Sequence, residues 1–281
     1  MLERTKPFGL AGLIGLPVAH SRSPVLHNYW LAEHGIAGRY VPLPVTADDL
    51  PDALKGLAAL GFRGCNVTMP HKRDIIPHLA KVDPMARRID AINTVVVEED
   101  GTLSGYNYDG LGFVQAVLDA CPDWRAESGP VLLLGAGGAA RSVAVAMLEA
   151  GVPDLRIANR TPEKAEAMAR EFGARVSALP WERRADALAD VALLVNTTDR
   201  GFLGKPALDI ALDRLDPRTI VGDLIYTPPE TPFLAAARAR GNPTVNGLGM
   251  LLNQARFGFR AWYGVMPEIT PGLVAAIEAT F

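Results

Sequence analysis

The chain of 281 residues contains little cysteine and no long apolar run. Its two cysteines, Cys65 and Cys121, are too few for a disulfide framework. No apolar stretch approaches the roughly 20 residues that a membrane-spanning helix needs. The first residues, MLERTKPFGLAGLIGL, carry charges but lack the apolar core and cleavage site of a secretory signal. These absences predict a cytoplasmic protein in a reducing environment, without a membrane partner.

A run of basic residues is also absent. The chain has 28 Lys and Arg against 31 Asp and Glu, a net charge of −3, so nucleic acid is not an expected partner. Apolar residues make up 49% of the chain, which is enough to form buried cores. At about one domain per 150 residues, the length favours two domains. Both a monomer and a homodimer are compatible with the sequence.

Short apolar runs typical of strands alternate with helical runs over nearly the whole chain. The first half shows expected strands at 11–17, 38–45 and 62–67, and expected helices at 23–35, 46–61, from about 70, and at 109–120. The segment INTVVVEEDGTLSGY predicts a hairpin that turns at EEDG. Such alternation predicts an α/β fold with mostly parallel strands.

The segment CPDWRAESGP, residues 121–130, interrupts this alternation with two prolines and a glycine, and we place a domain junction there. A strand–turn–helix unit, VLLLGAGGAARSVAVAMLEAG, follows it. Further strands are expected in LRIANR, VALLVN and TIVGDLIY, and helices at 250–264 and near 271–279.

The turn in VLLLGAGGAA contains Gly135, Gly137 and Gly138. Glycines at a strand-to-helix turn let backbone N–H groups approach a pyrophosphate at the helix N-terminus. The alternative is an ordinary tight turn, although the apolar strand before it favours a dinucleotide site. No Gly-Lys-Ser/Thr follows, which disfavours a phosphate-binding P-loop.

The next strand ends in Asn159, Arg160 and Thr161, without a carboxylate. An NAD site typically places an acid here for the ribose 2′-hydroxyl, whereas Arg160 is suited to pair with a 2′-phosphate. In the alternative interpretation Thr161 and Pro162 only cap the next helix, with Arg160 solvated. The missing acid favours NADP as the cofactor.

Two serines follow the first expected strand, in HSRSP. Ser23 before Pro24 is typical of a helix N-cap. Together with Ser21 and the helix N-terminus, Ser23 could also bind a carboxylate. His20, His27 and His34 recur every seven residues, but no carboxylate joins them at ligand spacing, so we predict no metal.

The segment NVTMPHK ends the third strand with Asn66 and Thr68 and then presents Lys72. Ligands of open α/β sheets bind at the carboxyl ends of strands. In the first turn of the expected helix, Lys72 would meet the positive end of the dipole, which lowers a lysine pKa and suits a proton carrier. The alternative is a solvated surface lysine. The neighbours Cys65 and His71 are predicted to be packing and surface residues, respectively.

Two further polar clusters occur, at Asn93–Thr94 and at Asn107–Asp109. Asp109 has the position of a helix N-cap. If it lies near Lys72, the two side chains form a proton-transfer pair. One lysine and one aspartate among amides and hydroxyls suit a small polyhydroxy acid as the substrate.

With these motifs in place, the chain resembles the shikimate dehydrogenase family over nearly its whole length. The matching segments are GLPVAHSRSPVLHN, NVTMPHK, DAINTV, GYNYDG, LLLGAGGAAR, ANRT, VNTT, DLIYTPPETPFL and GLGMLLNQA. The resemblance implies reversible reduction of 3-dehydroshikimate to shikimate with NADPH, in aromatic biosynthesis. It implies a mostly parallel α/β substrate domain of residues 1–120 and 248–281, and a Rossmann-like NADP-binding domain of residues 121–247.

The resemblance also implies roles for individual residues. It makes Lys72 and Asp109 the catalytic pair. It places Ser21, Ser23 and Tyr226 at the substrate carboxylate, and Asn66, Thr68, Asn93 and Gln254 around the ring hydroxyls. Tyr108 stands where the family pattern Asn-Thr-Asp-Gly has threonine, and we predict that its hydroxyl meets the substrate. The implied cofactor residues are Gly135, Ala136, Gly137, Gly138, Ala139, Asn159, Arg160, Thr161, Thr197 and Gly247.

Three other functions compete with this one. A sibling enzyme would act on quinate or an aminated shikimate. A non-catalytic regulator would bind NADP without turnover, against which the presence of both Lys72 and Asp109 argues. A methyltransferase with a glycine-rich sheet would leave the first-domain motifs without a role.

Overall fold

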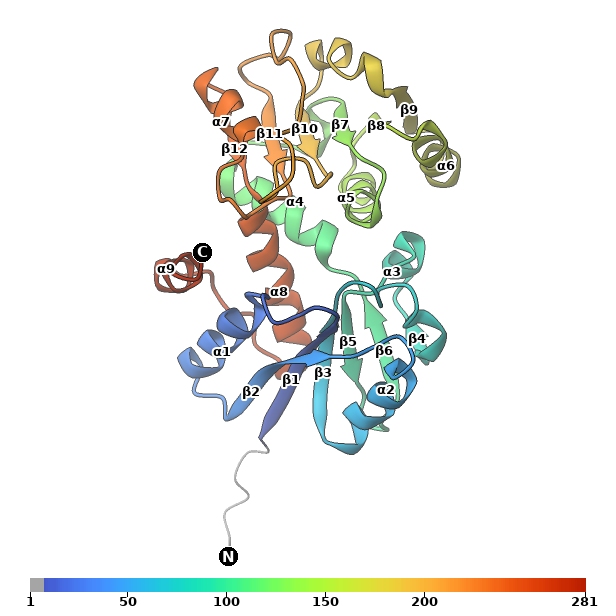
Figure 1. Ribbon diagram of the computed structural model, residues 1–281, viewed down its shortest axis with the longest axis vertical. Helices are drawn as coiled ribbons and strands as arrows, with labels where there is room; N and C mark the ends of the chain where they lie inside the picture. Colours follow the sequence, from blue (N-terminus) through green and yellow to red (C-terminus); the bar gives the residue numbers. More distant parts are fainter. Residues whose placement is uncertain (1–7) are drawn as a thin grey trace, which may run out of the picture. The chain divides into compact units, whose positions relative to one another are not determined.

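The computed structural model describes residues 8–281, which form two compact units (Figure 1). The first unit comprises residues up to Tyr108 together with Ala255–Phe281, and the second comprises Asp109–Gln254. The chain therefore leaves the first unit once and returns to it. Helix α4 (Asp109–Ala120) and the start of helix α8 (Gly247–Tyr263) belong to the second unit in this division. The boundaries expected from the sequence, 120/121 and 247/248, assign these two segments to the first domain.

A six-stranded sheet with the order β2-β1-β3-β5-β6-β4 forms the centre of the first unit. Its strands are β1 (Gly9–Gly15), β2 (Gly38–Pro44), β3 (Phe62–Val67), β4 (Lys81–Val82), β5 (Thr94–Val97) and β6 (Leu103–Tyr106). β1 is parallel to β2 and β3, whereas β5 pairs antiparallel with both β3 and β6. The predicted hairpin is confirmed, and Gly101 takes a positive φ of 81° in its turn.

Helices α1 (Ser23–Glu33), α2 (Leu50–Ala59), α3 (Pro84–Ile89), α9 (Pro271–Glu278) and the end of α8 complete the first unit. Alternate residues of a strand face opposite sides of the sheet, so Ile14 joins an aliphatic cluster and Leu13 joins an aromatic one. The aromatic cluster holds Trp262 of α8, whose indole N–H donates to the carbonyl of Val95 at 2.9 Å. The returning C-terminal segment therefore closes the core of the first unit.

The helix predicted from about residue 70 is wrong. Residues 70–75 form turns, and only a short 3₁₀ helix, Ile76–His78, follows. Proline in this segment explains the difference, because Pro77 has no N–H to donate to the carbonyl of Arg73. The nearby helix is α3, which the sequence analysis missed. Asp83 caps it by accepting from the N–H groups of Met85 and Ala86.

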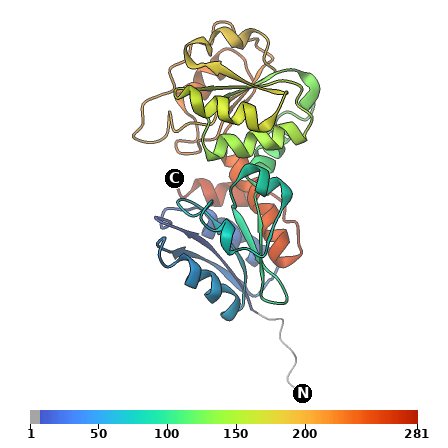
Figure 2. The ribbon, with the colours of Figure 1, turned by 90° about the vertical axis from the view of Figure 1, so that its right-hand side faces the viewer.

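The second unit contains a sheet of six parallel strands in the order β12-β11-β10-β7-β8-β9. The strands are β7 (Val131–Leu134), β8 (Leu155–Asn159), β9 (Val176–Pro180), β10 (Leu193–Asn196), β11 (Ile220–Asp223) and β12 (Thr244–Val245). Helices α5 (Gly138–Glu149) and α6 (Pro162–Phe172) lie side by side on one face of the sheet (Figure 2), and α7 (Pro232–Ala239) packs on β11 and β12. The predicted Rossmann-like fold is confirmed.

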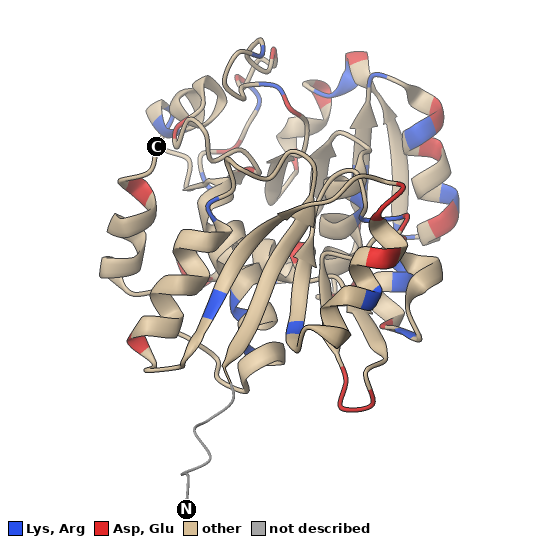
Figure 3. Ribbon diagram, turned by 60° about the horizontal axis from the view of Figure 1, so that its bottom comes forward, with Lys and Arg blue, Asp and Glu red and all other residues tan. Residues whose placement is uncertain are grey.

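Charged residues of both signs are interspersed along the ribbon, with blue and red on the same helices (Figure 3). The apolar runs of the sequence are instead used inside the two sheets, where β7 is buried at all four positions. Among residues 8–281, none of the helices has the length and apolar character needed to cross a membrane.

Candidate functional site

Ser21 precedes α1 and Ser23 is the first residue of this helix, so the predicted N-cap at Ser23 is wrong. The N-cap is Arg22, whose side chain makes no capping hydrogen bond to the first turn of the helix. The hydroxyl of Ser21 instead accepts from the N–H of Ser23 at 3.2 Å. Ser23 is buried and Ser21 is half-buried. The two serines lie at the start of α1, in the segment that follows the carboxyl end of β1.

Asn66 and Thr68 lie at the carboxyl end of β3, as expected from the sequence. Thr68 continues the strand pairing by donating its N–H to the carbonyl of Ile14 at 2.9 Å. Lys72 follows in the turn and is half-buried, and its own carbonyl accepts from the N–H of Ile92 at 2.7 Å. Since a turn replaces the predicted helix, Lys72 does not lie in the first turn of a helix.

Asn93 lies beside Asn66 on the neighbouring strand end. Its side-chain oxygen accepts from the N–H of Tyr108 at 3.0 Å and from the hydroxyl of Thr94 at 2.9 Å. The side-chain amide of Asn66 donates to the carbonyl of Asn93 at 3.0 Å. The fold of the first unit thus gathers Asn66, Asn93, Thr94 and Tyr108 from three strand ends into one hydrogen-bonded cluster.

The ring of Tyr108 packs between two other aromatic rings. It stacks on Tyr106 with centroids 5.7 Å apart and lies 5.3 Å from Phe257. Burial, followed by the electrostatic effect of Tyr106, raises the pKa of the Tyr108 phenol above its ordinary value. The phenol therefore stays protonated at neutral pH and keeps a hydrogen to donate.

Two neighbours of the cluster are buried. The surface position predicted for His71 is wrong: the residue is fully buried, and its Nε2 lies 2.7 Å from the carbonyl of Val45. Cys65 is buried as predicted, in the aliphatic core of the first unit. The burial of His71 could not be predicted from local sequence, because its partner is a backbone carbonyl 26 residues away.

The glycine turn of the second unit follows β7, where neighbouring β10 also ends. Gly135 takes a φ of 117°, and a side-chain carbon at this position would lie 2.6 Å from the hydroxyl of Thr197. Added carbons at Gly137 and Gly138 would contact no atom within 4 Å. Of these three glycines, Gly135 is the one that packing against neighbouring atoms requires. At Gly137 and Gly138 the absence of a side chain leaves the N-terminus of α5 accessible to a pyrophosphate.

The end of β8 is tied directly to this turn. The side-chain oxygen of Asn159 accepts from the N–H of Ala136 at 3.1 Å, and its amide donates to the carbonyl of Thr161 at 2.8 Å. Arg160 is exposed, and Thr161 is the N-cap residue of α6. The structure thus places the predicted phosphate-selecting segment next to the glycine turn.

A buried carboxylate, which the sequence analysis did not single out, organises the adjoining strand ends. Asp223 ends β11 with none of its surface exposed, and accepts from the amide of Asn196 at 3.0 Å, the N–H of Ile225 at 3.1 Å and the hydroxyl of Thr231 at 2.8 Å. Burial raises the pKa of Asp223 to about 6, although these three donors oppose the increase. An acid within the apolar run TIVGDLIY was the sequence signal for this site.

The other candidate residues of the second unit lie on a loop and on three helices. Tyr226 follows Asp223 by three residues and is half-buried. Gly247 begins α8, where a side-chain carbon would lie 2.1 Å from the carbonyl of Leu224. Asp109 is the first residue of α4, and the buried Gln254 lies on α8, packed against Gly112 of α4. Ala139 is exposed in the first turn of α5.

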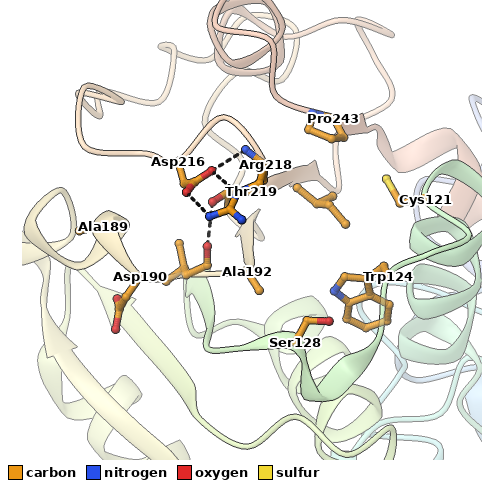
Figure 4. A pocket seen from close by; sticks show the side chains of 12 residues that line it. Cys121, Trp124, Ser128, Ala189, Asp190, Ala192, Asp216, Arg218, Thr219 and Pro243 are labelled. Carbon is orange, nitrogen blue, oxygen red and sulfur yellow. Dashed lines mark hydrogen bonds and ion pairs between the residues drawn. The ribbon is translucent and has the colours of Figure 1, made fainter.

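A cavity of about 490 Å³ opens at the opposite, amino ends of the strands in the second unit (Figure 4). Arg218 and Asp216 pair at its wall at 2.9 Å, and Asp190 pairs with Arg156 at 2.6 Å. Its charges are therefore neutralised within the protein. Ligands of parallel sheets bind at the carboxyl ends, so we do not assign the cavity to the functional site.

Among the described residues, no group of three or more His, Cys, Asp and Glu side chains is arranged to hold a metal ion. The buried His27 instead packs among aromatic rings, stacked on Tyr40 with centroids 4.3 Å apart. Burial lowers the pKa of His27 to about 3, so the ring is neutral at physiological pH.

One unit contains a six-stranded parallel sheet with an open glycine turn at the start of α5, and the other α/β unit carries a polar cluster. This combination is typical of a dinucleotide-dependent oxidoreductase. Matches to known protein families support this class. Residues 13–95 match the shikimate dehydrogenase substrate binding domain, and residues 121–202 match the shikimate / quinate 5-dehydrogenase family.

Full-length relatives extend the match. The chain is 48% identical to the NADP(+) shikimate dehydrogenase of Paramagnetospirillum magneticum, over 95% of this chain and 97% of that one. Its fold matches shikimate 5-dehydrogenase of Thermus thermophilus, solved with NADP(H) and shikimate, with a TM-score of 0.86 and 38% identity over 98% and 100% of the two chains. It also matches quinate dehydrogenase of Corynebacterium glutamicum, solved with NAD, with a TM-score of 0.88 and 31% identity over 96% and 98%. The chain belongs to the shikimate dehydrogenase family.

Proposed function

We propose that the protein catalyses the NADPH-dependent, reversible reduction of 3-dehydroshikimate to shikimate in aromatic amino acid biosynthesis. The observation that carries this proposal is the 48% identity with an NADP(+) shikimate dehydrogenase over 95% of the chain. The polar cluster of the first unit supports it, because hydroxyl groups on a ring need several directional partners, and Asn66, Thr68 and Asn93 would supply them.

The residues of the second unit fit NADP. The open glycine turn at α5 would hold the pyrophosphate, with Gly137 and Gly138 allowing its close approach. Arg160, beside Asn159 at this turn, would pair with the 2′-phosphate, since no carboxylate ends β8. When bound, this cofactor supplies or accepts the hydride.

The proton that accompanies the hydride requires a group of the protein. We assign this role to Lys72, with Asp109 as its partner carboxylate. Support comes from the half-buried position of Lys72 after the carboxyl end of β3. The substrate carboxylate would be bound by Ser21, Ser23 and Tyr226. The substrate ring would contact Gln254 and Tyr108, and the cofactor would contact Thr197 and Gly247. In the reduction a lysine ammonium donates its proton to the carbonyl oxygen, and in the oxidation the neutral lysine amine accepts the hydroxyl proton.

We further propose that the protein works in the reducing cytoplasm as a monomer or homodimer. Both cysteines are free, as is usual where thiols stay reduced.

Side-by-side initial rates with shikimate, quinate and an amino analogue of shikimate, each with NADP and with NAD, test the proposed function. We expect the highest kcat/KM for shikimate with NADP. A higher kcat/KM for quinate would identify the sibling enzyme. Tight NADP binding without turnover of any of the three would support a non-catalytic regulator.

A further inference from the structure

Tyr40, which no part of the proposed mechanism uses, holds the side chain of Asn66. It lies on β2, is 1% exposed, and donates its hydroxyl to the side-chain oxygen of Asn66 at 2.7 Å. Its ring is fixed on one side by the stacked imidazole of His27 and lies 6.0 Å from the ring of Trp262. A ring held in this way keeps its hydroxyl at one place.

The orientation of the Asn66 amide follows from its partners. A backbone carbonyl can only accept, so the Asn66 atom that lies 3.0 Å from the Asn93 carbonyl must be the nitrogen. The side-chain oxygen then faces Tyr40, as observed. The hydroxyl of Thr94 gives its hydrogen to the Asn93 side chain at 2.9 Å, and can therefore accept the second amide hydrogen of Asn66 at 3.1 Å.

Both hydrogens of the Asn66 amide are thus used inside the protein. Its oxygen has two acceptor sites, and Tyr40 fills one of them. The neighbouring His27 is neutral because burial lowers its pKa, and the proximity of Asn66 opposes this decrease only in part. Neither ring nitrogen of His27 lies in hydrogen-bond geometry with a partner among the described residues. The side chain of Asn66 can accept a hydrogen bond from a ligand, but it has no hydrogen left to donate.

We propose that Tyr40 is a positioning residue that makes Asn66 a hydrogen-bond acceptor only, so that Asn66 selects a substrate group that donates, such as a hydroxyl, and rejects one that only accepts. This inference rests on the proposed function and deepens it. The ring position that meets Asn66 is then one that keeps its hydroxyl in both substrate and product, because a carbonyl there would face an acceptor.

The variant Tyr40→Phe removes the hydroxyl and keeps the ring against His27. We expect the KM for shikimate to rise about three- to tenfold, the usual effect of losing one such hydrogen bond, with kcat and the KM for NADP nearly unchanged. Tyr263→Phe is the matched control, because the Tyr263 ring lies in the same aromatic region, and its hydroxyl donates to the carbonyl of Gly9 at 3.4 Å rather than to Asn66. We expect no change in the KM of this control.

A double-mutant cycle separates positioning from a general structural effect. If Tyr40 acts through Asn66, Tyr40→Phe changes nothing further in an Asn66→Ala background. Equal effects of Tyr40→Phe in both backgrounds, or an unchanged KM in the single variant, would overturn the inference.

Substrate analogues test the polarity directly and do not depend on whether Asn66→Ala folds. Fluorine in place of a ring hydroxyl accepts weakly but cannot donate. At the position that meets Asn66, we expect the fluoro analogue to bind as poorly as the deoxy analogue, and this penalty to shrink in Tyr40→Phe. Fluoro analogues that all bind better than their deoxy counterparts would refute the acceptor role. A wild-type protein inactive on shikimate would instead refute the proposed function.

Discussion

Arg160 is exposed at the end of β8, next to the side chain of Asn159 that is bonded to the glycine turn. A charge-assisted contact between its guanidinium and a 2′-phosphate contributes about 1.5–3 kcal/mol, roughly a ten- to hundredfold difference in affinity. We therefore expect Arg160→Ala to raise the Kd for NADP by this factor and to leave the Kd for NAD nearly unchanged, as measured by titration calorimetry.

The control for this variant is Arg170→Ala, which removes the same charge from the exposed side of α6. It should leave both cofactor affinities unchanged. Equal losses of NADP and NAD affinity in Arg160→Ala would show that Arg160 supports the fold rather than the 2′-phosphate.

Tyr108 differs from the threonine of the family pattern, and its ring is held between Tyr106 and Phe257. Its hydroxyl remains protonated at neutral pH, since burial raises the pKa. If this hydroxyl meets the substrate, Tyr108→Phe costs about 0.5–1.5 kcal/mol and raises the KM for shikimate severalfold, with NADP binding unchanged.

Tyr106→Phe is the matched control, because it removes the hydroxyl of the stacked neighbour. A KM for shikimate that stays the same in Tyr108→Phe would assign the phenol to packing and remove Tyr108 from the substrate contacts.

At the scale of elements, Asp223 joins the loop after β10 to the turn after β11 and to the N-terminus of α7. Asn196, which donates to Asp223, also accepts from the N–H of Thr198 at 3.1 Å. Thr231 donates to the carboxylate and accepts from the N–H of Leu234 as the cap of α7. One buried side chain therefore fixes the segments that carry Thr197 and Tyr226.

The raised pKa of Asp223 makes the free energy of unfolding depend on pH. The folded protein holds the proton up to about pH 6, whereas the unfolded chain releases it near the ordinary value of 3.8. Between these values the native state binds more protons, so the contribution of Asp223 to the free energy of unfolding falls as pH rises, by up to roughly 3 kcal/mol. Above pH 6 this contribution is constant.

Asp223→Asn removes this titration. Urea unfolding between pH 4 and 7 should show wild-type stability decreasing relative to the variant up to pH 6 and then running parallel to it. Asp199→Asn, an exposed change in the adjoining loop, should keep the wild-type profile. A constant difference between wild type and Asp223→Asn at every pH would refute the raised pKa.

At the scale of the whole molecule, local patterns predicted the two sheets well. The run VLLL forms a strand that is buried at all four positions, FRGCNV forms one that is buried at its last four, and the EEDG segment turns the hairpin. The segment after Thr68 failed because its helical pattern contains Pro77, and tertiary contacts such as that of the Lys72 carbonyl with Ile92 hold it as turns.

Parts of the candidate site could be predicted from the sequence only where the residues that form them are consecutive in the chain. Asn159–Thr161 and the glycine turn are of this kind. The bonds of Tyr40 to Asn66 and of Asp223 to Asn196 join residues 26 and 27 positions apart, so pairing of strands, rather than sequence spacing, brings them together. Burial of His71 has the same origin, because its carbonyl partner lies on another segment.

In the proposed mechanism, Lys72 moves the proton while NADP carries the hydride of shikimate. The most direct measurement is the kcat of shikimate oxidation with NADP for wild type, Lys72→Ala and the exposed-lysine control Lys55→Ala. We predict that wild type and the control are equally active and that Lys72→Ala loses about 10²–10⁴-fold in kcat, with a smaller change in KM. A Lys72→Ala variant with nearly wild-type kcat would contradict the mechanism.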